Sequence, residues 1–153
     1  MENKEMIEKL TDLVKLDIDA VHAYGQAIKH IDISDVREQV VKFQGDHERH
    51  VTNLSEAIRL LGGQPPEFSR DFKGYLLEGF TALRSMTGTE GALKALKSAE
   101  EMTNKKYSEA RSWNVPMDVL SIIQGNYEDE QRHLSYVNQC ISDRVWEVAE
   151  VKR

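Results

Sequence analysis

The amino-acid sequence predicts an all-α protein, a single domain over residues 1–153 built as a bundle of four long helices with one long crossover. Apolar residues recur at the three- and four-residue spacing of amphipathic helices over four stretches of the chain. Only three prolines interrupt the chain, and no stretch shows the sustained alternation typical of a strand. The helical pattern also occurs twice, which indicates a duplicated pair of helices.

The first two helices are predicted over residues ~4–30 and ~35–61. Gly62 and Gly63 provide a stop signal after the second helix, because glycine readily adopts the backbone conformation that ends a helix. The apolar positions that should face the core are Leu10, Leu13, Val21, Tyr24 and Ile28 in the first helix and Val36, Val40, Phe43, Leu54, Ile58 and Leu61 in the second.

The third and fourth helices are predicted over residues ~89–112 and ~116–146. Thr87 and Glu90 fit a capping box at the start of the third helix. Pro116 suits the first turn of the fourth helix, where its missing N–H costs nothing. The core-facing positions are Leu93, Leu96, Ala99 and Tyr107, followed by Leu120, Ile123, Tyr127, Val137 and Ile141.

The segment of about residues 62–88, between the second and third helices, is too long for a tight turn. It contains a run of apolar residues, and we predict a short helix there at about Phe72–Ser85. A long crossover would let the second and third helices run parallel, as bundles with one crossover require.

Composition excludes several classes of function. Lys and Arg number 20 against 26 for Asp and Glu, and the net charge of -6 argues against binding nucleic acid or an anionic membrane. No apolar run reaches the roughly 18 residues of a membrane span, and the first residues, MENKEMIEKL, lack the apolar stretch of a signal peptide. Cys140 is the only cysteine, so an internal disulfide and a cysteine-based metal site are both excluded. We therefore expect a cytoplasmic protein.

An internal repeat relates the two halves of the chain. Tyr24 recurs as Tyr107 and His50 recurs as His133, at one constant offset of 83 residues (107 − 24 and 133 − 50). This gapless offset aligns the first helix with the third and the second with the fourth. It also pairs polar positions: Asp17 with Glu100, Asp46 with Asp129, and His47 with Glu130.

Ligand-type side chains lie on the apolar stripes of all four helices. Burying an unpaired ionised carboxylate costs several kcal/mol or more, so such groups need compensation inside a core. Two divalent cations would supply it, and carboxylate and imidazole ligands suit iron, manganese or zinc. Glu and His at an i, i+3 spacing lie on one helix face. The candidate metal ligands are Asp17, His47, His50, Glu100, Glu130 and His133.

These motifs resemble the ferritin-like superfamily, in particular its rubrerythrin-type branch and the small bacterial members that lack a rubredoxin domain. The family pattern is one acidic ligand from each of two helices and Glu-x-x-His from each of the other two. The resemblance covers about residues 8–145. It implies Asp17 and Glu100 as the single carboxylates, Glu130 with His133 as one motif, and His50 as the histidine of the other.

The resemblance also implies a function. It favours two iron ions that react with oxygen or peroxide, with zinc or manganese as alternatives. An electron-donor protein would then be needed, because the sequence offers no second redox centre. Pairing of two chains as a homodimer is a further expectation by analogy. Tyr24 and Tyr107 should pack in the core with their hydroxyls bonded beside the site.

The chain departs from the family pattern at two ligand positions. His47 stands where the family has a bridging Glu, and Asp17 is one methylene shorter than Glu. The extra histidine would shift preference toward zinc, a mixed site, or one tight and one weak site. Two alternatives stay open: Asp46 in place of His47, and Glu101 in place of Glu100. A second function is therefore also considered, a non-catalytic bundle that binds zinc structurally or no metal and acts as an interaction module.

Overall fold

The computed structural model describes residues 1–69, 80 and 86–147, and it confirms the all-α prediction. Within these residues there is no β-strand. None of the described helices is both long enough and apolar enough to cross a membrane. The four long helices are α1 (Asn3–His30), α2 (Ser34–Leu60), α3 (Gly88–Ala110) and α4 (Met117–Ser142).

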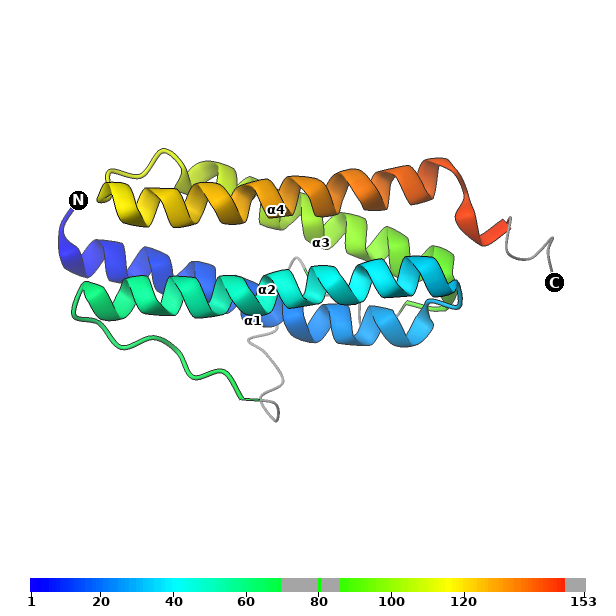
Figure 1. Ribbon diagram of the computed structural model, residues 1–153, viewed down its shortest axis with the longest axis horizontal. Helices are drawn as coiled ribbons and strands as arrows, with labels where there is room; N and C mark the ends of the chain where they lie inside the picture. Colours follow the sequence, from blue (N-terminus) through cyan, green and yellow to red (C-terminus); the bar gives the residue numbers. More distant parts are fainter. Residues whose placement is uncertain (70–79, 81–85, 148–153) are drawn as a thin grey trace.

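The helices form a bundle of two antiparallel hairpins, α1 with α2 and α3 with α4 (Figure 1). α2 ends at one end of the bundle and α3 begins at the other, so these two helices run parallel, as the predicted long crossover requires (Figure 1). The short helix predicted at about Phe72–Ser85 lies outside the described residues, apart from Phe80, which is buried.

Most residues of the predicted apolar stripes form the core. Ile28, Leu61, Tyr127 and Ile141 are only partly buried against it, and Val119 takes the core position predicted for Leu120. Both central tyrosines, Tyr24 and Tyr107, are fully buried, and every helix has at least one fully buried leucine or isoleucine. The ends of the helices follow the predicted stops closely, except that α4 ends at Ser142, before the predicted residue 146. Arg144 there adopts a positive φ of 48°, which a continuing helix cannot accommodate.

Two predicted helix-end signals have different outcomes. Gly62 has a φ of 87°, and the N–H of Gly63 donates to the Ile58 carbonyl at 2.9 Å, which closes α2 as predicted. The predicted capping box of α3 is wrong, because no side-chain hydrogen bond caps that helix. Gly88 adopts a φ of 70° directly after Thr87, and Glu90 instead pairs with Lys94 at 2.6 Å.

Candidate metal centre

Six ionisable side chains meet inside the bundle, and all of them are fully buried. They come from all four helices, because each helix has one or two buried Asp, Glu or His residues on its mainly apolar buried face. The structure thus brings together all six candidate ligands named from the sequence: Asp17 on α1, His47 and His50 on α2, Glu100 on α3, and Glu130 and His133 on α4.

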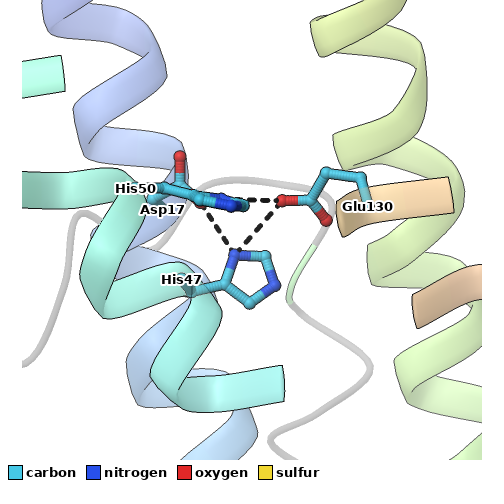
Figure 2. Close-up of side chains that lie close together, drawn as sticks. All are labelled: Asp17, His47, His50 and Glu130. Atoms are coloured by element: carbon cyan, nitrogen blue, oxygen red, sulfur yellow. Dashed lines mark hydrogen bonds and ion pairs between the residues drawn. The ribbon is translucent and has the colours of Figure 1, made fainter. Parts of the chain in front are cut away.

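One group of four contains Asp17, His47, His50 and Glu130, which point toward one another from three helices (Figure 2). Asp17 Oδ1 lies 2.7 Å from Nδ1 of His47 and 3.1 Å from Nδ1 of His50. Glu130 Oε1 lies 3.4 Å and 3.3 Å from the same two nitrogens. Four potential ligand atoms therefore surround one small space.

A second group of four contains His47, Glu100, Glu130 and His133. Glu100 Oε1 lies 3.2 Å from Nε2 of His47 and 3.4 Å from Nδ1 of His133. Glu130 Oε2 lies 3.5 Å from Nδ1 of His133. In each group the ligand atoms all lie within 4.8 Å of one another, so either group could surround one metal ion.

His47 and Glu130 belong to both groups. Glu130 turns Oε1 toward the first group and Oε2 toward the second. His47 turns Nδ1 toward Asp17 and Nε2 toward Glu100. The sequence repeat aligns these two residues with each other, and the structure places both of them between the two groups.

Hydroxyl groups bind the carboxylates of the cluster. Tyr24 donates a hydrogen bond to Glu100, and Tyr107 donates one to Asp17, so each tyrosine bonds the carboxylate of the other half of the repeat. The hydroxyl of Thr103 lies 3.1 Å from Glu100 Oε2 and 3.0 Å from Glu130 Oε2. The two tyrosines were expected near the site, and they contact candidate ligands directly.

Asp46 and Asp129 hold the outer edges of two histidine rings. His50 Nε2 donates to Asp129 at 2.8 Å, and His133 Nε2 donates to Asp46 at 2.8 Å, each bond crossing from α2 to α4. Arg49 forms ion pairs with both aspartates. Each histidine therefore turns Nδ1 inward, a role for the aspartates that reasoning from the apolar stripes missed.

The sequence did contain a signal for this arrangement. Both halves of the repeat carry Asp-x-x-Arg-His, at residues 46–50 and 129–133. Like Arg49, Arg132 forms ion pairs with both Asp46 and Asp129. Identical charged residues at equivalent positions indicate equivalent roles for the aspartates and arginines in the two halves of the chain.

The structure distinguishes the alternatives left open by the sequence. His47 is fully buried within the cluster, whereas Asp46 lies on the outer side of His133 and belongs to neither group. Glu100 is fully buried, whereas its neighbour Glu101 is exposed. His47 and Glu100 are therefore the candidate ligands of these two pairs.

Without metal, the three histidines are held in the charged form. Burial alone would favour the neutral rings, but the surrounding carboxylates outweigh it. They raise the pKa of His47 to about 9, the pKa of His133 to about 11 and the pKa of His50 to about 12.

The carboxylates of the cluster differ from one another. Burial acts to raise the pKa of Asp17 and Glu100, yet the neighbouring histidines hold both pKa values below the usual range. Burial and the charge of Glu100 together raise the pKa of Glu130. The carboxylate shared by the two groups is therefore the one that takes up a proton most readily.

The comparisons with known proteins agree with this fold. A family model described as "Domain of unknown function (DUF2383)" matches residues 5–112, well over half of the chain. No curated protein matches. A crystal structure described as that of ferritin like, diiron-carboxylate proteins from Bacillus anthracis str. Ames is similar with a TM-score of 0.72 at 17% identity, over 92% of this chain and 99% of that chain. The chain has a ferritin-like fold and belongs to the DUF2383 family.

Proposed function

We propose that this protein binds two metal ions in the buried cluster, and that with iron bound it reacts with oxygen or peroxide. One observation carries the proposal: two groups of four ligand-type side chains share His47 and Glu130 at the centre of the bundle. Each group also has its own carboxylate and its own histidine. This is the arrangement expected for a pair of ions rather than for a single one.

The residues present fit such a pair. Carboxylate oxygens and imidazole nitrogens are ligands that suit iron, manganese and zinc. Glu130 Oε1 and His133 Nδ1 are buried facing the cluster and make no well-aligned hydrogen bond, and their nearest ion-pair partners lie 3.3 Å and 3.4 Å away. Buried polar atoms are normally satisfied, so two such atoms at one site favour a bound group there.

The protein's own residues would prepare the site. Asp129 and Asp46 orient His50 and His133, as carboxylates do for metal-bound histidines. The fully buried cluster keeps bulk water away from the reacting centre. When bound, an iron pair supplies the electrons for reduction of oxygen or peroxide.

The structural neighbour supports iron by analogy, because its description names a diiron-carboxylate protein. Sustained turnover would need an electron-donor protein, which we include in the proposal. We also propose, by analogy with such bundles, that two chains pair as a homodimer.

A second function is favoured by His47. With His47 in both groups, each metal position would have two nitrogens and two carboxylates, a set that suits four-coordinate zinc. The protein would then be a non-catalytic bundle that zinc stabilises. Zinc has no redox chemistry, so this candidate and the first differ in their response to oxygen.

An anaerobic titration of metal-stripped protein with Fe(II), followed by exposure to oxygen, tests the proposal. We expect two iron ions per chain and oxidation to ferric iron that is faster than in buffer alone. Glu130→Ala combined with His133→Ala should abolish binding, whereas Glu128→Ala, an exposed site on the same helix, should not. Full iron content in the double variant would contradict the proposed site. Zinc binding without any iron binding would favour the second function.

A further inference from the structure

We propose that the imidazole ring of His47 joins the two metal positions, with one ring nitrogen bound to each ion. The inference rests on the proposed function, because it requires both positions to be filled. It assigns to His47 the role of setting the separation, and through it the chemistry, of the metal pair.

The orientation of the ring carries this inference. Nδ1 lies 2.7 Å from Asp17 Oδ1 and 3.4 Å from Glu130 Oε1, both in the first group. Nε2 lies 3.2 Å from Glu100 Oε1, in the second group. The two nitrogens of one ring therefore face different carboxylates, Asp17 in the first group and Glu100 in the second.

The surroundings hold the ring in this orientation. His47 is fully buried, with its ring centroid 5.0 Å from that of Tyr24, 5.6 Å from that of His50 and 5.1 Å from that of His133. A ring enclosed by three others cannot rotate out of the cluster without repacking them. Metal ions would therefore meet both nitrogens where they already lie.

Geometry distinguishes this bridge from a carboxylate bridge. Ions bridged by oxygen ligands in two-metal sites lie about 3.5–4 Å apart. The two nitrogens of an imidazole ring diverge, so with metal–nitrogen bonds of about 2 Å the two ions must lie farther apart than that. Both ring protons of His47 would pass to solvent as the two ions bind.

The internal repeat supplies a matched variant. Glu130 occupies the position equivalent to His47, so His47→Glu gives both halves the same residue at the centre. We expect that variant to bring the ions closer together. His47→Gln is the control, because its amide cannot replace a ring that binds through two nitrogens.

The test is X-ray absorption spectroscopy on full-length protein loaded with zinc alone, together with the number of zinc ions per chain. We expect two ions in the native protein without a metal–metal signal at or below about 4 Å, and such a signal in His47→Glu. His47→Gln should hold fewer than two ions. Circular dichroism checks that each variant is folded. If a variant is unfolded, the X-ray absorption spectrum of the native protein alone still tests the inference.

Three results would overturn the inference. Two ions with a short metal–metal distance in the native protein would show a carboxylate or solvent bridge, and would leave the proposed function intact. One ion per chain would show that His47 serves a single position. No zinc and no iron would reject the metal centre itself, and with it the inference.

Discussion

Glu100 and Glu101 are neighbours in the sequence, yet only Glu100 is buried in the cluster. A rotation of about 100° per residue separates them around α3, which places Glu100 in the core and Glu101 in solvent. Burial therefore selects between two chemically identical side chains.

This difference gives a matched pair of variants. We expect Glu100→Gln to bind at most one metal ion per chain, because the second group loses its own carboxylate. Glu101→Gln should keep two, since its side chain faces solvent. Metal analysis of both proteins after gel filtration checks this, and equal metal content in the two would contradict the assignment of Glu100.

Asp129 acts on the site through His50. Its carboxylate accepts a hydrogen bond from His50 Nε2 at 2.8 Å, which leaves Nδ1 to face the cluster. Removing such a support typically costs 10–100-fold in metal affinity. We expect Asp129→Asn to lose about that much in a competition titration with a chelator. Glu128→Gln, the exposed neighbour, is the control, and equal affinity in the two variants would show that Asp129 does not orient the ring.

The raised pKa values of the histidines predict how the stability of the protein depends on pH. Their pKa values are raised on folding, so in metal-free protein they contribute stability that is complete below about pH 6.5, their usual pKa. That stability is lost as the pH rises through the pKa values that the histidines have in the folded protein. The first of these is the pKa of His47, at about 9. We expect the melting temperature of metal-free protein to fall between pH 6.5 and 9. A smaller fall is expected in His47→Gln, whereas a flat or rising native profile would contradict the ion-pair account.

At the scale of single elements, periodicity predicted the four helices because each stripe has to be buried. The same stripes identified the six buried ligand-type residues, since an ionisable group at such a position is costly unless something compensates it. Asp46 and Asp129 were not assigned their role, because they lie beside the stripes and their partners are on another helix. The capping box failed for a local reason, the left-handed backbone at Gly88.

The end of α2 can be tested by exchanging glycine for alanine. Gly62 has a φ of 87°, so Gly62→Ala should cost about 1–2 kcal/mol in the free energy of unfolding. Gly45 lies exposed inside the same helix, and a Cβ there would meet nothing within 4 Å, so Gly45→Ala should gain up to about 1 kcal/mol. Urea denaturation measures both. Destabilisation of similar size in both variants would contradict this account of the helix end.

For the whole molecule, the duplicated hairpin explains how the site is built. Contacts occur in pairs related by the offset of 83 residues: Tyr24–Glu100 with Tyr107–Asp17, and His50–Asp129 with His133–Asp46. A pseudo-two-fold axis through the cluster follows from these pairs. The gapless repeat in the sequence could predict which residues correspond, but not that equivalent residues would contact each other's partners, because that depends on how the hairpins pack.

The surroundings of the cluster break this symmetry. Asn53 and Asn126 exchange hydrogen bonds of 2.9 Å and 3.0 Å, and Asn126 also donates to the hydroxyl of Tyr107 at 3.3 Å. The equivalent residues in the other half are Tyr136 and Phe43, whose rings lie 5.4 Å apart. One side of the centre is therefore covered by amides and the other by aromatic rings, so the two metal positions should differ in affinity.

Anomalous diffraction from crystals grown with Fe(II) under anaerobic conditions tests the central claim most directly, because it locates each ion. The account requires two anomalous peaks per chain, one within bonding distance of Asp17 and His50 and the other of Glu100 and His133, with Glu130 between them. A chain with an empty, ion-paired cluster, or with iron bound only at surface carboxylates, would contradict it.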